Sequence, residues 1–134
     1  MREIFVFGSN LVGIHGAGAA RFAKLEHGAV TGQGIGLQGN SYGIPTKDYY
    51  MRTLPLATIR DHVNDFIKFA HEYPNLRFNL TRIGCGLAGY KDEAIAPLFA
   101  TVVYLPVPNV RLPTGWRELI QTGHRPFISD EWED

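Results

Sequence analysis

The stretch Ile4-Phe5-Val6-Phe7-Gly8 is a short, continuous apolar run that ends at a glycine. A run of this length is typical of a strand that is buried on both faces of a sheet. A loop over 9–15 separates it from Gly16–Leu25, an alanine-rich segment that predicts a helix with small residues at its start. A buried strand followed by a helix is the repeating unit of layered α/β domains. The chain is therefore expected to begin as an α/β domain.

The strongest helix signal lies further along, from Thr58 to Tyr73. Apolar residues recur there at the spacing of a single helical stripe, namely Ile59, Val63, Phe66, Ile67 and Ala70. Thr58, with Asp61 three residues later, resembles a capping box, and Pro74 predicts the end of the helix.

Shorter segments complete the alternation of strands and helices. Glycines over 32–39 favour a turn or a loose hairpin, and Pro45 marks 41–46 as an edge strand or a strand end. The remaining predictions are a strand over 77–83, a helix over 93–103 with Pro97 in its first turn, a strand over 107–112, a helix over 116–121 closed by Gly123, and a mobile acidic tail over 130–134. This order predicts one layered α/β domain over residues 1–134, with a parallel or mixed sheet and a C-terminal extension over about 115–134.

The composition excludes several classes of protein. With 45% hydrophobic and 12% aromatic residues, the 134-residue chain can bury a core, which excludes low-hydrophobicity disorder. Thirteen basic residues balance thirteen acidic ones, so no overall field attracts nucleic acid. No apolar run approaches the roughly 18 residues of a membrane span, and the apolar N-terminus is too short for a signal peptide. A single cysteine, Cys85, cannot form an internal disulfide, and we expect a cytoplasmic protein without membrane association.

The 15 glycines gather over 8–18, 28–43 and 84–89. The first and third groups follow strand-like runs directly, and ligands of such sheets bind outside the carboxyl ends of strands, so we expect both groups at one crevice. Gly16-Ala17-Gly18 at a helix start can seat a phosphate on unpaired N–H groups, or can simply let the helix pack tightly on the sheet. Alternating glycines over 83–90 can turn N–H groups toward an anion, or can make a tight turn from strand to helix. Two such loops together suit a diphosphate.

Three motifs, in order, resemble the macro-domain family. They are Phe7-Gly8-Ser9-Asn10 with the segment 13–20 that follows, then Ser41–Lys47, then Arg82–Leu87. The last two are similar to the branch that holds the terminal ADP-ribose glycohydrolases and the antitoxin glycohydrolases that remove ADP-ribose from DNA. The resemblance covers roughly Ile4 to Phe99. It implies a three-layer α/β fold, with a mixed central sheet flanked by helices, that binds ADP-ribose.

The resemblance also implies roles for individual residues. Asn10 stands where the family's asparagine contacts the distal ribose, and Lys47 stands where the branch has a lysine that attacks or polarises the anomeric carbon of that ribose. The ligand-binding candidates lie in the two glycine-rich loops: Ser9, Gly16, Ala17, Gly18, Gly84, Cys85, Gly86, Leu87 and Gly89. From the residues alone, Asn10 could instead close an Asx turn, and Lys47 could be an exposed lysine at a strand end.

The chain departs from the family pattern at two places. Ala88 stands where some members of the branch carry an aspartate, which argues against one acid-assisted mechanism. No acidic residue is seen where many macro domains hold the adenine amino group, which leaves the base contact open. Asp48 adjoins Lys47 and could replace the missing acid, but neighbours in an extended strand point to opposite faces.

Other patterns carry weaker signals. Gly39-Asn40-Ser41-Tyr42-Gly43 has the G-x-S-x-G pattern of hydrolases but lacks the strand before it and the helix after it. Residues 34–39 fit a dinucleotide fingerprint without opening a helix. The five histidines show no ligand spacing, so we expect neither a metal nor a cofactor, although His15 could touch phosphate if it is not simply exposed. Cys85 is interpreted as a small buried residue rather than a nucleophile.

Together with the two glycine-rich loops, the resemblance implies a protein that binds ADP-ribose, either free or attached to a protein or DNA, and that hydrolyses an ADP-ribosyl bond through Lys47 and Asn10. Two alternatives stay open: a non-catalytic module that binds ADP-ribose or related nucleotides, and a phosphatase that acts on ADP-ribose phosphates. Tyr90, Tyr104 or Trp116 could stack on a base, but the sequence does not choose among them, and such residues more commonly pack in the core.

Overall fold

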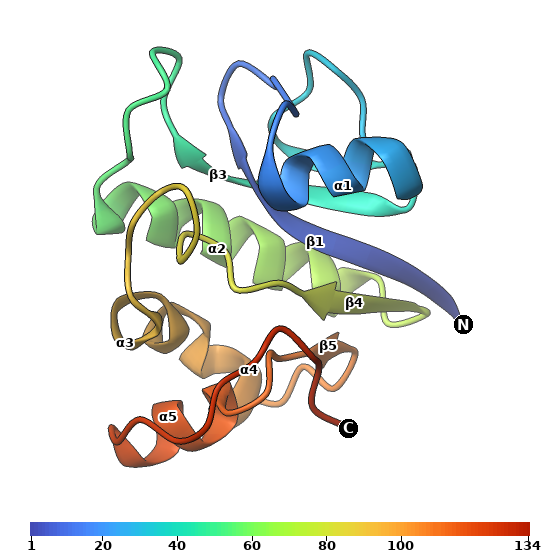
Figure 1. The fold of residues 1–134 in the computed structure, drawn as a ribbon. Helices are drawn as coiled ribbons and strands as arrows, with labels where there is room; N and C mark the ends of the chain where they lie inside the picture. The colour runs from blue at the N-terminus through green and yellow to red at the C-terminus, as the bar shows by residue number, and fades with distance from the viewer.

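The computed structural model describes all 134 residues (Figure 1). Its elements are β1 (Arg2–Asn10), α1 (Gly18–Glu26), β2 (Gly36–Gln38), β3 (Ser41–Lys47), α2 (Leu56–Glu72), β4 (Leu76–Leu80), α3 (Asp92–Ile95), the 3₁₀ helix η1 (Ala96–Phe99), α4 (Ala100–Tyr104), β5 (Val110–Arg111) and α5 (Trp116–Thr122). This order follows the alternation predicted from the sequence. None of the helices is long and apolar enough to cross a membrane.

The five strands form one mixed sheet in the order β2-β3-β1-β4-β5. The central strand β1 pairs in parallel with β3 on one side and with β4 on the other, and β5 continues the parallel set beyond β4. Only β2 runs antiparallel, as the first arm of a hairpin with β3. The predicted α/β class with a mixed sheet is confirmed, as is the predicted hairpin over 32–39.

Side chains of β1 alternate between two apolar layers, as the pleat of a strand requires. Ile4 and Val6 belong to the larger core cluster, which includes the buried face of α2. Phe5 and Phe7 belong to a smaller cluster, which includes Ala20 and Ala23 of α1. Helices α1 and α2 therefore cover opposite faces of the sheet (Figure 1). The expectation that the first strand is buried on both faces is confirmed.

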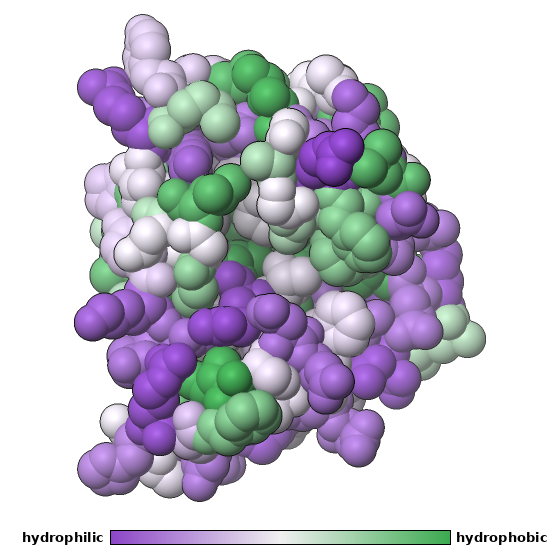
Figure 2. Space-filling view, viewed as in Figure 1, coloured by the Kyte–Doolittle hydropathy of each residue, from purple (hydrophilic) through white to green (hydrophobic).

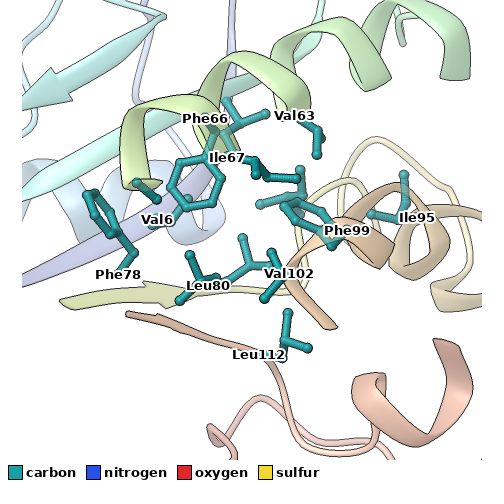
Figure 3. Close-up of a cluster of buried hydrophobic side chains, with 14 of the residues drawn as sticks. Val6, Val63, Phe66, Ile67, Phe78, Leu80, Ile95, Phe99, Val102 and Leu112 are labelled. Carbon is teal, nitrogen blue, oxygen red and sulfur yellow. The ribbon is translucent and has the colours of Figure 1, made fainter. Parts of the chain in front are cut away.

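The larger core lies between the sheet, α2 and the segments that follow β4 (Figure 3). All five apolar residues of the predicted helical stripe are buried: Ile59, Val63, Phe66, Ile67 and Ala70. The ring of Phe66 meets that of Phe78 on β4 edge to face, with ring centroids 5.4 Å apart. Aromatic pairs of this geometry contribute about 0.5–1.5 kcal/mol beyond the area they bury.

Two helix starts differ from the prediction. The capping box at Thr58 is wrong, because α2 begins at Leu56 and no side chain caps it. The carbonyl of Pro55 instead accepts from the N–H groups of Thr58 and Ile59, at 3.0 and 3.1 Å. At the first helix, Gly16 and Ala17 lie before α1 rather than inside it, since Ala17 is extended at φ −154°.

The helix predicted over 93–103 is broken into α3, η1 and α4. Pro97 lies in the first turn of η1, where its missing N–H costs no helical hydrogen bond, whereas an unbroken α-helix could not run through it. Two strands are shorter than predicted. β4 ends at Leu80 rather than at residue 83, and β5 is reduced to Val110–Arg111.

The acidic tail is not the mobile segment that the sequence predicted. It pairs with the strand-like residues before α5, through an isolated bridge between Pro113 and Trp132. The N–H of Glu133 donates to the carbonyl of Leu112 at 2.9 Å, and the N–H of Thr114 donates to the carbonyl of Glu131 at 2.8 Å. These contacts join residues far enough apart in sequence that composition alone could not reveal them.

Candidate functional site

A pocket of about 720 Å³ opens where the parallel strands β1, β3 and β4 reach their carboxyl ends. Its volume falls within the usual range for small-molecule sites. Figure 2 shows the hollow near the middle of the molecule's face. Every sequence-predicted site residue lines this pocket except Gly89; those that do are Ser9, Asn10, Gly16, Ala17, Gly18, Lys47, Gly84, Cys85, Gly86 and Leu87.

Asn10 organises the loop that follows β1. Its side-chain Oδ1 accepts from the N–H groups of Gly13 and Ile14, at 2.8 and 3.0 Å, and its Nδ2 donates to the carbonyl of Ile14 at 2.7 Å. The Asx-type closure that the residues alone allowed is therefore present. Only one of the two Nδ2 hydrogens is used within the chain, so the second can reach a ligand. The hydroxyl of Ser9 likewise donates inward, to the carbonyl of Gly34.

The start of α1 leaves a row of backbone N–H groups without partners. None of the amides over 16–20 donates to a backbone acceptor; the first that does is Arg21, to the carbonyl of Ala17 at 3.2 Å. Gly18 has φ +58°, a conformation that other residues adopt at a cost. Unpaired amides at a helix N-terminus carry partial positive charge and favour an anion.

The loop after β4 supplies a second set of unpaired amides. Those of Gly84, Gly86, Leu87 and Ala88 have no backbone acceptor. The loop is closed by two other amides, of Gly89 to the carbonyl of Gly86 at 3.0 Å and of Tyr90 to the carbonyl of Gly84 at 2.8 Å. Gly89, which was also expected at the ligand, differs from the other candidates, because its N–H is used in this turn and it does not line the pocket.

The two loops lie against one another across the pocket. A Cβ atom built on Gly18 would stand 3.7 Å from Cδ1 of Leu87, in ordinary van der Waals contact. The loops thus meet from opposite sides, as the placement of the glycine groups after two neighbouring strands predicted.

Lys47 ends β3 beside the end of β1. Its backbone pairs with Asn10 across a bulge in the ladder, and its carbonyl accepts from the N–H of Leu11 at 3.0 Å. The backbone is held on the other side by a bridge to Thr53. The side chain takes part in none of the ion pairs of the structure. A lysine is therefore held on a rigid element at the pocket with its amine uncommitted.

Asp48 does not serve as a second acid in the pocket. Its carboxylate accepts from the N–H groups of Tyr50 and Arg52, at 2.8 and 3.0 Å, and pairs with the Arg52 side chain. The backbone hydrogen bond from Arg52 is the main reason why the pKa of Asp48 is lowered. The carboxylate thus shapes the turn after β3, and Asp48 does not line the pocket.

Arg82 is a pocket residue that the sequence did not single out. Its guanidinium forms a two-pronged pair with Asp92, at 2.8 Å from Nε and 2.7 Å from Nη2. Trp116 donates from Nε1 to the same carboxylate at 2.8 Å. Burial would raise the pKa of Asp92, but the hydrogen bonds from Arg82 and Trp116 outweigh it and hold that pKa well below its usual range. One positive charge is therefore fixed at the pocket wall.

The aromatic residues of the pocket are not the ones considered from the sequence. Phe5, Phe22 and Trp132 line it. Of the residues that the sequence offered for stacking, Tyr90, Tyr104 and Trp116, none lines the pocket. Trp116 is fully buried, and the hydroxyl of Tyr90 donates to the carbonyl of Leu54 at 2.7 Å.

The weaker patterns of the sequence have structural explanations. His15 is 3% exposed, so it is not the exposed residue that the sequence allowed, and it does not line the pocket. Its Nε2 lies 3.0 Å from the carbonyl of Val30, which accepts from it. Ser41, in the G-x-S-x-G pattern, is buried in β3 and donates to the carbonyl of Gln38 at 2.7 Å. Residues 34–39 contain β2 (Gly36–Gln38), the first arm of the hairpin, and not a strand-to-helix turn.

Cys85 lies at the pocket as a thiol of low reactivity. Burial raises its pKa to about 12. We expect 5,5′-dithiobis(2-nitrobenzoic acid) at pH 8 to label the native protein at least about tenfold more slowly than the unfolded chain, because the thiolate population falls and its greater nucleophilicity offsets only part of that loss. Equal rates in the native and the unfolded protein would contradict this assignment.

Comparison of the chain with protein-family models, with curated proteins and with solved structures gave no match. What the pocket binds is therefore inferred from its own residues.

Proposed function

We propose that this chain is a macro-domain-like protein of three layers that binds ADP-ribose and hydrolyses an ADP-ribosyl bond. The observation that carries the proposal is the meeting of two sets of unpaired amides, those of residues 16–20 and those of Gly84 and residues 86–88, in one pocket that also contains Lys47 and Asn10. Unpaired amides that line one cavity from two loops suit two linked phosphates better than one. A diphosphate with a sugar on either side fits that arrangement.

The rest of the ligand follows from the two ends of the pocket. Lys47 and Asn10 come from the ends of β3 and β1, whereas Trp132 lies beside β4 and donates from Nε1 to the carbonyl of Leu80 at 2.7 Å. We assign the distal ribose to the Lys47 end. The base lies at the aromatic end, where Phe5 and Phe22 also line the pocket and where flat rings can stack on it.

Lys47 is proposed as the nucleophile. The lone pair on Nζ of an unprotonated Lys47 forms a bond to the anomeric carbon of the distal ribose while the bond from that carbon to the target breaks. The target leaves with the bonding electron pair and takes up a proton. Water then adds to the same carbon, which frees ADP-ribose and returns the lysine amine. Asn10 can orient a ribose hydroxyl through the Nδ2 hydrogen that the loop leaves free.

One observation favours the non-catalytic alternative. Asp130, which comes from the tail, is the one acidic residue among those that line the pocket, so no carboxylate stands beside Lys47 to protonate the leaving group. A protein of this kind would bind ADP-ribose without releasing it from a target. Release assays on wild type separate the two functions.

The proposal is tested first by calorimetry and then by assays of product release. ADP-ribose is expected to bind, and adenosine, which lacks the diphosphate, is expected to bind much more weakly. Wild type is then incubated with an ADP-ribosylated peptide and an ADP-ribosylated oligonucleotide, and free ADP-ribose is measured. Binding without release from either substrate would establish the module, and phosphate release from ADP-ribose 1″-phosphate would indicate the phosphatase. Absence of ADP-ribose binding would remove the proposal.

The anion-binding role of the second loop can be tested by one added charge. Gly86 has no positive φ, and a Cβ there meets no atom within 4 Å, so a short side chain fits without strain. We expect Gly86→Asp to weaken ADP-ribose binding by about tenfold relative to Gly86→Asn, because a carboxylate near the diphosphate is repelled. The asparagine variant has the same size and controls for steric effects. Equal affinities of the two variants in calorimetry would place the phosphates elsewhere.

A further inference from the structure

The hydroxyl groups of the pocket have no proton free for a leaving group. Three of them line it, and the single hydrogen of each is donated to a main-chain carbonyl of the fold. The donor and acceptor pairs are Ser9 with Gly34, Thr46 with Ser9 at 3.3 Å, and Thr81 with Val6 at 2.7 Å. A group that leaves the distal ribose can therefore take no proton from a hydroxyl of the site.

The ionisable groups of the pocket do not supply that proton either. Besides Lys47, they are Arg82, Cys85 and Asp130. The guanidinium of Arg82 does not lose its proton, and burial raises the pKa of Cys85 to about 12, too high for a general acid near neutral pH. The side chain of Asp130 is 88% exposed and lies 3.6 Å from Arg82, so it is a carboxylate at neutral pH. Lys47 itself must be unprotonated to attack.

The walls next to Lys47 are apolar. Met51, in the turn that directly follows Lys47, and Ala88, whose carbonyl accepts from the hydroxyl of Thr53 at 2.9 Å, both line the pocket. Thr53 is the residue that bridges to Lys47. Met51 has φ +63°, a left-handed conformation that costs free energy outside glycine, and its N–H donates to the carbonyl of Asp48 at 3.1 Å. The turn thus holds a thioether side chain at the pocket, beside the proposed nucleophile.

We propose that the site hydrolyses a nicotinamide dinucleotide such as NAD⁺, whose pyridinium ring can leave the distal ribose without a proton. The inference rests on the proposed function and names a substrate class for that site. The ADP-ribose half lies along the two sets of amides, and the nicotinamide lies against Met51 and Ala88. A thioether makes favourable contacts with flat rings.

The reaction balances with water as the only second reactant. The lone pair on Nζ of Lys47 forms a bond to the anomeric carbon, and the bond from that carbon to the ring nitrogen breaks. The bonding pair stays on that nitrogen, so the cationic ring leaves as neutral nicotinamide. Water then adds to the carbon as its bond to Nζ breaks, which gives ADP-ribose, the lysine amine and one proton in solution.

The apolar walls favour this leaving group over others. An alkoxide or an amine needs a proton as it leaves, and the help of a general acid that the site lacks is worth about 10²–10⁴-fold in rate. A carboxylate also leaves without a proton, but it becomes charged beside Met51 and Ala88, whereas the pyridinium ring loses its charge there.

The test compares NAD⁺ with NADH, and free nicotinamide is measured by chromatography. Wild type is expected to release nicotinamide from NAD⁺ at least about 10²-fold faster than Lys47→Ala purified in the same way, which measures the background. NADH is the matched control substrate: its reduced ring is uncharged and would have to leave as an anion, so it is expected to bind without being cleaved.

A pair of variants tests the position of the ring. Met51→Gly removes the thioether, and it is expected to lower kcat/KM for NAD⁺ by about three- to tenfold, the effect of one contact between a thioether and a ring. Affinity for ADP-ribose, which has no ring at this end, should stay unchanged, and the Tm should not fall, because glycine adopts a positive φ freely. Tyr49→Ser, at an exposed residue of the same turn that does not line the pocket, is expected to keep the wild-type rate.

The outcomes separate the substrate class from the function beneath it. If ADP-ribose does not bind to wild type, the proposed function fails. If ADP-ribose binds but wild type releases no more nicotinamide than Lys47→Ala, the substrate class is overturned, and release from a glutamate-linked peptide would then assign the site to carboxylate leaving groups. Cleavage of NADH at the rate of NAD⁺ would show that the site protonates its leaving group. Equal kcat/KM of wild type and Met51→Gly would overturn the placement of the ring.

Discussion

Replacing Lys47 with alanine is expected to reduce the release of ADP-ribose by about 10²-fold or more, the scale on which loss of a reacting side chain affects catalysis. Binding of free ADP-ribose should change by much less, because the unpaired amides of residues 16–20, of Gly84 and of residues 86–88 remain. Release would be followed by single-turnover kinetics on an ADP-ribosylated peptide and oligonucleotide, and binding by calorimetry. A loss in rate without a matching loss in affinity identifies Lys47 as a residue of the reaction.

Two further variants define what Lys47 contributes. Lys47→Arg keeps the charge but presents a guanidinium that does not lose its proton, so it cannot attack the anomeric carbon. Release by Lys47→Arg at close to the wild-type rate would show that the charge polarises the ribose and that no covalent step takes place. Lys68→Ala, on the exposed side of α2, controls for the loss of one positive charge. Full release by Lys47→Ala would locate catalysis elsewhere.

The site could be predicted from the sequence where it depends on strand ends. Glycine groups that directly follow two strand-like runs meet wherever those strands are parallel neighbours, and β1 and β4 are such neighbours. Lys47 joins them because β3 pairs with β1 on its other side. The two apolar layers around β1 and the apolar stripe on α2 could also be predicted, because strand alternation and the helical period are local properties of the sequence.

The parts that the sequence did not reveal depend on distant pairing. Trp132 and Asp130 reach the pocket because the tail pairs with the segment around Pro113. No local pattern in the sequence predicts this pairing. His15 is buried because the loop that contains Val30 covers it. The start of α2 at Leu56 was not predicted, because no side chain caps this helix. The N–H groups of Thr58 and Ile59 donate to the backbone carbonyl of Pro55, and such a contact leaves no mark in the sequence.

The second large effect is expected at Asp92, which joins the pocket wall to the C-terminal helix. Asp92 is 2% exposed and accepts from Arg82 and Trp116. Asp92→Ala should lower the free energy of unfolding by about 3 kcal/mol, because it leaves the partly buried charge of Arg82 and the N–H of Trp116 without their acceptor. Thermal unfolding would detect this as a fall in Tm of about 10 °C. Asp130→Asn is the control, since it removes the exposed partner of the same arginine and should cost under about 1 kcal/mol.

The pH dependence of stability gives an independent check on the same residue. Because the pKa of Asp92 is lower in the folded protein than in the unfolded chain, its contribution is fully present above the unfolded value of about 4 and is lost as the pH falls below it toward the folded pKa. In denaturant titrations, the stability difference between wild type and Asp92→Asn should therefore stay constant above about pH 5 and shrink below about pH 4. A difference that did not change on acidification would mean that Asp92 is not held as a carboxylate by Arg82 and Trp116. The position of Arg82 at the pocket would then depend on contacts other than its ion pair with Asp92.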